Sequence, residues 1–127
     1  MARPSLFDTD VLVDFFRGHS KAVAFVNAQS SRIILSTIVV AELYAGVKGE
    51  VEQAALHRFI SLFRVIPVSA EIAKIGGLYN RDYGKSHDMG LADAILAATA
   101  KTENAELKTL NIKHYPMIKG LFPAYKK

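Results

Sequence analysis

The sequence predicts an α/β fold in which a mostly parallel sheet of about four or five strands is covered by helices on both faces. Short apolar or β-branched runs alternate with longer runs of helical periodicity through most of the chain. Half of the 127 residues are apolar, which is enough for one well-packed core. Neither a repeat nor a linker divides the chain, so we expect a single domain over residues 1–127.

The first half of the chain carries the clearest element boundaries. It predicts strands at residues 4–7 and 32–35, and helices at 11–17, 20–27 and 37–45. Asp10 is a possible N-cap for the first helix, and Gly18 ends it. Ser36 and Thr37 can cap the third helix, which ends at Gly46. These signals predict a strand followed by a helix twice in succession.

The second half continues the alternation. It predicts helices at residues 51–63, 69–84 and 91–102, strands at 65–68 and 105–109, and a polar loop at 85–90. Pro67 places the third strand at an edge of the sheet or ends it. The pair Gly76-Gly77 lies within a helical pattern, where small residues permit close packing of helices.

Three carboxylates occur in apolar surroundings. Asp8 ends the first strand, Glu42 is the only charge in residues 38–45, and Asp93 is the only charge in residues 91–98. A helix that is apolar on every face is buried, and a carboxylate on it requires a partner. One shared cation would serve all three, and oxygen ligands suit Mg²⁺ or Mn²⁺. The alternative is that each acid is a helix cap or part of a separate ion pair.

The ends of the predicted strands indicate where chemistry is located. In parallel sheets, sites form at the carboxyl ends of the strands. Asp8 follows the first strand, and Thr109 and Asn111 lie at the end of the last. We therefore expect Asp8 and Asn111 in one cleft together with Glu42 and Asp93.

Four segments that carry these residues resemble, in order, the motifs of the PIN-domain superfamily, and most closely its VapC-type toxins. They are residues 7–14, 41–46, 91–100 and 109–116. The resemblance implies a three-layer α/β/α PIN-like fold and a metal-dependent endoribonuclease that is the toxin of a type II toxin–antitoxin pair. It implies a catalytic set of Asp8, Glu42, Asp93 and Asn111, in which the three acids bind Mg²⁺ or Mn²⁺ that activates a water.

The fourth position of this set departs from the family pattern. Many relatives have an aspartate there or a few residues later, whereas this chain has Asn111 and then His114. Because an asparagine leaves one fewer negative charge at this position, a second metal would be held less firmly. Thr109 resembles a hydroxyl residue near the family's site, although a plain strand-end role is equally compatible. The roles of Asp10 and His114 stay open, and we expect Asp14 to face solvent near Arg17.

The expected partners follow from charge and from the resemblance. The net charge is +4, and five lysines follow Glu106 without a carboxylate, which suits RNA. We expect an antitoxin whose C-terminal segment places an arginine or lysine near Asp8 and Asp93. We also expect a homodimer formed through apolar helix faces at residues 22–26 and 56–63. Without a cysteine, a signal peptide or a membrane span, the expected location is the cytoplasm.

Two alternative functions stay open at this point. Asp8-Thr9-Asp10 mimics the D-x-D signature of haloacid-dehalogenase-like phosphatases, in which Asp8 would be the nucleophile. Asn111 leaves open a catalytically degenerate PIN fold that only binds nucleic acid or protein. Cleavage of RNA that depends on a metal would distinguish the ribonuclease from both.

Overall fold

A computed structural model describes residues 3–127, and its centre is a parallel sheet of four strands in the order β3-β2-β1-β4. The strands are β1 (Ser5–Phe7), β2 (Ile33–Ser36), β3 (Arg64–Ile66) and β4 (Glu106–Lys108). Every pairing is parallel, as the alternation of strands and helices predicts. β3 is an edge strand and ends directly before Pro67, so the prediction from that proline is confirmed.

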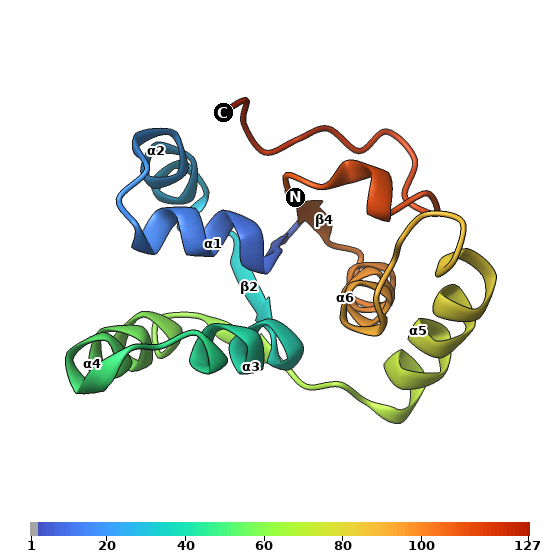
Figure 1. The fold of residues 1–127 in the computed structure, drawn as a ribbon, viewed down its shortest axis with the longest axis horizontal. Helices are drawn as coiled ribbons and strands as arrows, with labels where there is room; N and C mark the ends of the chain where they lie inside the picture. Colours follow the sequence, from blue (N-terminus) through green and yellow to red (C-terminus); the bar gives the residue numbers. More distant parts are fainter. Residues whose placement is uncertain (1–2) are drawn as a thin grey trace.

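Helices cover the sheet on both sides (Figure 1). They are α1 (Thr9–Phe16), α2 (Ser20–Gln29), α3 (Thr37–Ala45), α4 (Gly49–Ile60), α5 (Ala70–Tyr83) and α6 (Leu91–Thr102), followed by the short 3-10 helix η1 (Ile112–His114). In the view of Figure 1, α1, α2 and α4 lie to the left of the sheet, and α5 and α6 lie to the right. The α/β expectation with a helix layer on each side is therefore confirmed.

Helix caps fix where the chain turns from strand to helix. Ser36 caps α3 and Ser69 caps α5, each by accepting a backbone N–H with its hydroxyl. The N-cap of α1 is Asp8, so the prediction that Asp10 caps this helix is wrong. α1 begins two residues earlier than the pattern suggested because the strand ends at Phe7 and leaves Asp8 in extended geometry. Gly18 has a φ of +78°, which glycine adopts readily and which ends the α1 segment.

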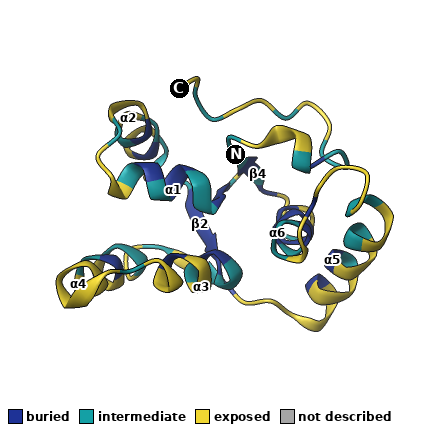
Figure 2. Ribbon diagram, in the orientation of Figure 1, coloured by how far each residue is buried: buried dark blue, intermediate teal, exposed yellow. Residues whose placement is uncertain are grey.

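The core lies along the sheet and the helix faces turned to it (Figure 2). Leu6, Phe7 and Leu35 have no exposed surface. The helix faces expected to form a dimer contribute to this core, since Val26 and Leu56 are 3% and 5% exposed. Leu62, in the second of these segments, is 74% exposed, so part of that surface stays free and the homodimer stays a prediction.

The parallel register brings together the ends of the central strand β1 and the edge strand β4. Phe7 of β1 is paired with Lys108 of β4, and the Asp8 backbone N–H donates to the Lys108 carbonyl at 2.9 Å. The next residues, Asp8 and Thr109, are therefore neighbours although 101 positions separate them in the sequence. This register places the candidate site at the carboxyl end of the sheet.

The C-terminal segment returns to the first helix. The Ala124 backbone N–H donates to the Thr109 carbonyl at 2.9 Å. The Tyr125 hydroxyl donates to Asp14 at 2.7 Å, and the Lys127 ammonium lies 3.0 Å from the same carboxylate. Asp14 is only 7% exposed, so the prediction that it faces solvent is wrong. Burial opposes ionisation of Asp14, but the hydrogen bonds from Tyr125 and Lys127 outweigh it and lower the pKa of this carboxyl.

Close packing of α5 on α6 depends on one of the two adjacent glycines. A Cβ at Gly76 would lie 3.0 Å from the backbone and side chain of Ile95, whereas one at Gly77 would meet no atom within 4 Å. The prediction of close packing therefore holds for Gly76 and not for Gly77. None of the helices in residues 3–127 has both the length and the apolar character needed to cross a bilayer.

Candidate active site

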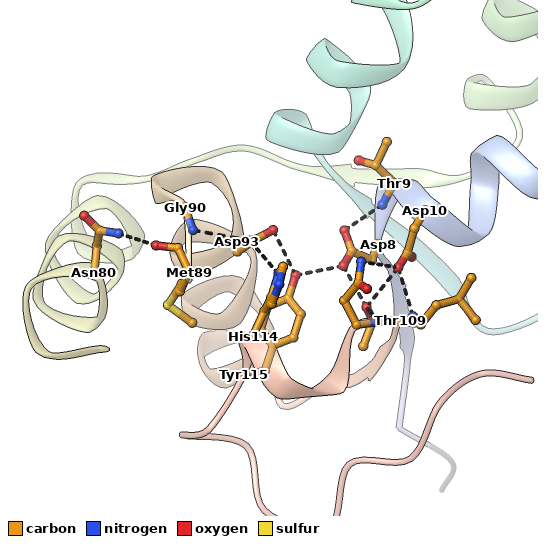
Figure 3. A network of polar contacts seen from close by, with 12 residues as sticks. Asp8, Thr9, Asp10, Asn80, Met89, Gly90, Asp93, Thr109, His114 and Tyr115 are labelled. Carbon is orange, nitrogen blue, oxygen red and sulfur yellow. Dashed lines mark hydrogen bonds and ion pairs between the residues drawn. The ribbon is translucent and has the colours of Figure 1, made fainter. Parts of the chain in front are cut away.

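Asp8 is the centre of a polar network at the carboxyl ends of β1 and β4 (Figure 3). Its side chain accepts hydrogen bonds from the Thr9 backbone N–H, the Thr109 hydroxyl and the Tyr115 hydroxyl, each at 2.8 Å. Asp8 is 7% exposed. Burial raises the pKa of Asp8, the hydrogen bonds from Tyr115, Thr109 and Thr9 oppose this, and the charge of Asp93 adds to it.

Asp93 joins this network through a tyrosine. The Tyr115 hydroxyl lies 2.8 Å from Asp8 Oδ2 and 3.3 Å from Asp93 Oδ1 (Figure 3). The other Asp93 oxygen lies 3.3 Å from His114 Nδ1 and 3.4 Å from the Gly90 backbone N–H. Asp93 therefore caps the start of α6, as the alternative explanation held, and also faces Asp8.

Burial and the two neighbouring carboxylates keep Tyr115 protonated. Burial of the phenol raises the pKa of Tyr115 strongly, and the charges of Asp8 and Asp93 raise it further. The phenol therefore keeps its proton over the physiological range of pH and can donate a hydrogen bond throughout it. The side chain itself is 1% exposed.

Asp10 and Asn111 form a second branch of the network. Asp10 accepts from the Leu110 backbone N–H at 3.0 Å, from the Asn111 side-chain amide at 3.2 Å and from the Thr109 hydroxyl at 3.4 Å. Burial, with a further contribution from the charge of Asp8, raises the pKa of Asp10 to about 6. Asn111 therefore uses its amide as a donor to Asp10. Thr109 joins the two branches, since its hydroxyl lies near both aspartates.

Glu42 lies at the outer side of the site. It is exposed, as are Ala41 and Tyr44, so the expectation that this helix is buried on every face is wrong. The buried residues of α3 are Val39 and Leu43, which form one face of it. Glu42 nevertheless points to the site, because the Thr9 hydroxyl donates to its Oε1 at 2.7 Å. The apolar composition of a short helix does not by itself show whether the helix is buried on every face or has one face in solvent.

The four residues expected in the cleft belong to one hydrogen-bond network, in which other residues link them. Asp8 and Asp93 meet at Tyr115, Glu42 connects through Thr9, and Asn111 connects through Asp10. Sequence reasoning assigned no role to Tyr115, which carries no feature that distinguishes it from a core aromatic residue. Its function in the network becomes visible only from its position beside two carboxylates.

The donors at this site suit a hard divalent cation. Within residues 3–127, no three of the Asp, Glu and His side chains converge into a cage. Mg²⁺ does not require one, because it retains several waters and binds through one or two carboxylates. Asp8 and Asp93 supply such a pair, and a cation would compensate the desolvated charge of Asp8. The donor set therefore fits Mg²⁺ or Mn²⁺ and contains no thiolate.

A groove beside Glu42 lies between α1, α3 and α4. It encloses about 400 Å³, and apolar side chains form much of its lining. The lining includes Val13, Phe16, Leu43 and Leu56, together with Glu42 itself. Phe16 is 42% exposed, which is high for such a large apolar side chain. The groove thus joins an apolar surface to the acidic site.

The parallel sheet, its covering helices and the acidic network around Asp8 have the features of a PIN domain. The model of the PIN-domain family matches residues 5–115. The chain belongs to this family. It is 39% identical to Ribonuclease VapC19 of Mycobacterium tuberculosis over 94% of this chain and 98% of the relative. It is 34% identical to Ribonuclease VapC10 of the same organism, over 94% of this chain and 92% of that one.

Solved structures agree with this assignment. A toxin–antitoxin complex from Klebsiella pneumoniae has a TM-score of 0.84 at 29% identity and covers 97% of this chain and 99% of its own. VapBC2 from Rickettsia felis, bound to a DNA fragment from its promoter, has a TM-score of 0.75 at 27% identity, over 94% and 96% of the two chains. The family assignment replaces the haloacid-dehalogenase alternative, whose D-x-D signature Asp8-Thr9-Asp10 only mimics.

Proposed function

We propose that this chain is a metal-dependent endoribonuclease and the toxin of a type II toxin–antitoxin pair. The observation that carries the proposal is that Asp8, at the carboxyl end of β1, and Asp93, in the first turn of α6, meet at the Tyr115 hydroxyl within a PIN domain. Relatives with more than a third of their residues identical are named ribonucleases. Residues Asp8 and Asp93 would hold Mg²⁺ or Mn²⁺, and Glu42 would complete the acidic set.

The chain's own residues have defined tasks in this proposal. A bound divalent cation lowers the pKa of a water and stabilises charge on the phosphate. Asp8 is held in one orientation by three donors, so it presents a fixed ligand oxygen. Asp10 lies beside this set, and in the metal-free chain burial raises its pKa to about 6. Asn111 orients Asp10 through its amide and adds no charge.

Cleavage of RNA by the purified chain tests this proposal. We expect cleavage with Mg²⁺ or Mn²⁺, none with EDTA, and a loss of at least about 100-fold in Asp8→Asn and in Asp93→Asn with the fold intact. Asp82→Asn is the matched control, since Asp82 is an exposed aspartate paired with Arg81. A wild-type chain that binds RNA without cleaving it would instead favour the degenerate PIN fold.

The partner in this proposal is a small antitoxin. The structural neighbours include toxin–antitoxin complexes, and the groove of α1, α3 and α4 offers an apolar surface that ends at Glu42. A peptide in this groove could place an arginine or lysine beside the acids, because the guanidinium fork matches a carboxylate. Inhibition should then compete with Mn²⁺, and replacing that one basic residue should relieve it. Unchanged Mn²⁺ affinity in the complex would exclude this mode of inhibition.

A homodimer is also part of the proposal. Leu62, in the segment 56–63 expected to form the dimer, is 74% exposed, and a second copy would cover such an apolar side chain. Light scattering across a range of concentrations should give twice the mass of the chain. A constant monomer mass would contradict the dimer.

A further inference from the structure

Tyr115 combines a buried aromatic ring with a hydroxyl that faces two carboxylates. The side chain is 1% exposed, and its hydroxyl lies 2.8 Å from Asp8 and 3.3 Å from Asp93. Figure 3 shows the hydroxyl between the two acids, which come from the end of β1 and the start of α6. No other side chain in residues 3–127 is hydrogen-bonded to both of them.

The packing holds this hydroxyl in place. The Tyr115 backbone N–H donates to the Ile112 carbonyl at 3.1 Å, and its carbonyl accepts from Ile118 at 3.0 Å. The chain is thus tied on both sides of the residue. With the ring buried and the backbone fixed, the hydroxyl has little freedom to leave the carboxylates.

The hydroxyl is not required for packing. A phenylalanine would bury nearly the same ring without the cost of desolvating a phenol oxygen, which is substantial unless a hydrogen bond compensates it. The compensation here comes from Asp8 and Asp93. A phenol carries one proton, so it donates fully to one acid at a time and keeps both acids close to the same oxygen.

We propose that Tyr115 is a positioning residue whose hydroxyl holds the Asp8 and Asp93 carboxylates together as a joint ligand pair for the divalent cation. This inference rests on the proposed function, in which these two acids bind that cation. Tyr115 acts through the acids and binds neither the metal nor the RNA. Hydrogen-bond partners that contact metal ligands from outside fix the orientation of those ligands and raise the affinity of the site for the metal.

The test compares the Mn²⁺ affinity of wild type and Tyr115→Phe by isothermal titration calorimetry, after removal of divalent cations with a chelator. We expect Tyr115→Phe to bind Mn²⁺ about 10- to 100-fold more weakly. Circular dichroism of the same samples should show an unchanged fold, because the ring is kept. Cleavage should be restored in part by raising the Mn²⁺ concentration, which a general loss of structure would not allow.

Tyr125→Phe is the matched control. Tyr125 also donates its hydroxyl to a buried aspartate, Asp14, at 2.7 Å, but that pair lies outside the network of Asp8. Its Mn²⁺ affinity should equal that of wild type. A loss in both variants would mean that any tyrosine hydroxyl bonded to a buried aspartate matters for the fold, and it would overturn a specific role for Tyr115.

The remaining outcomes separate this inference from the proposed function. A folded Tyr115→Phe that binds Mn²⁺ as tightly as wild type, or more tightly, overturns the positioning role and leaves the ribonuclease proposal standing. If the wild-type chain binds no Mn²⁺ and Asp93→Asn behaves in the same way, the metal-dependent function and the positioning role are both overturned.

Discussion

Thr9 and Glu42 are joined by a 2.7 Å hydrogen bond in which the threonine hydroxyl donates to Glu42 Oε1. The contact links the first residue of α1 to the middle of α3, across 33 positions of sequence. Thr9 also donates its backbone N–H to Asp8. One residue therefore orients an exposed acid and a buried acid toward the same place.

Glu42→Gln should reduce cleavage without reducing stability. Glu42 is exposed, so the free energy of unfolding should change by less than about 0.5 kcal/mol. Cleavage should fall at least about 10-fold, because the acidic set loses a charge that favours the cation. Parallel assays of cleavage and thermal unfolding measure both. Glu50→Gln, an exposed glutamate in the first turn of α4, should match wild type in both assays, and full activity of Glu42→Gln would remove Glu42 from the site.

Thr9→Val should lower cleavage by a smaller factor than Glu42→Gln does. Valine keeps the shape of threonine but loses the hydroxyl that donates to Glu42, so the acid stays present and is no longer oriented. The loss of an exposed hydrogen bond should cost at most about 1 kcal/mol of stability. Cleavage titrated against Mn²⁺ measures the effect. A Thr9→Val chain less active than Glu42→Gln would indicate that Thr9 has a task of its own.

Asp10 should make the metal-free chain less stable as the pH rises. Its pKa is raised to about 6 in the folded chain from an ordinary value of 3.8, so folding favours the protonated form. The stabilising contribution is complete below about pH 4 and is lost as the pH rises through about 6. Asp10→Asn should therefore be more stable than wild type at pH 7, by roughly 1–2 kcal/mol after allowance for partial exposure.

Thermal unfolding in EDTA between pH 4 and pH 7 measures this effect. Some pH dependence should persist in Asp10→Asn, because burial also raises the pKa of Asp8. Asp82→Asn is the control, since Arg81 lowers the pKa of that exposed carboxyl and its replacement should leave the slope between pH 4 and pH 7 unchanged. Equal slopes in wild type and Asp10→Asn would contradict the assignment.

Tyr125→Phe should destabilise the chain with the opposite dependence on pH. The Tyr125 hydroxyl and Lys127 lower the pKa of Asp14, so this carboxylate stabilises the fold above its ordinary pKa of about 3.8, and the contribution is lost as the pH falls below that. Removing the hydroxyl should cost about 1–3 kcal/mol at pH 7 and less at pH 3. Urea unfolding at both values measures it. Tyr44→Phe, at an exposed tyrosine, should have no effect, and an equal loss at both values would exclude the linkage to Asp14.

Alanine at the two adjacent glycines of α5 should act in opposite directions. Gly76→Ala places a methyl group 3.0 Å from Ile95 and should cost about 1–3 kcal/mol of stability. Gly77→Ala meets open space in a helix interior and should add roughly 0.5–1 kcal/mol. Chemical denaturation of each variant measures the sign. Destabilisation by both would mean that Gly77 also lies close to another part of the chain, contrary to the open space beside it.

Sequence patterns predict the helices and strands well because helix caps, glycines and prolines act on the residues next to them. Ser36 and Gly46 bound α3 at the expected residues, and Pro67 follows the edge strand β3. Asp8 is predicted because it ends an apolar strand, and Asp93 because it is the only charge in an apolar run, since a desolvated charge requires a partner. Such signals depend on neighbours in the sequence and not on the tertiary fold.

The residues that were missed depend on contacts between distant segments. Tyr115 reaches Asp8 across 107 positions, and Tyr125 reaches Asp14 across 111. Within its own segment each tyrosine is indistinguishable from a core aromatic residue. Glu42 shows the converse case, because an apolar composition suggested burial on a helix that has one face in solvent. Only the arrangement of the sheet and the returning C-terminal segment determines these three environments.

The pairing of the first strand with the last has a consequence for biosynthesis. Asp8 is synthesised well before its partners Thr109 and Tyr115, which follow it by more than 100 residues. A nascent chain lacks the neighbours that orient Asp8 until residue 115 has left the ribosome. The acidic site can therefore become ordered only after the whole segment from β1 to Tyr115 has been synthesised and the long loop between them has closed.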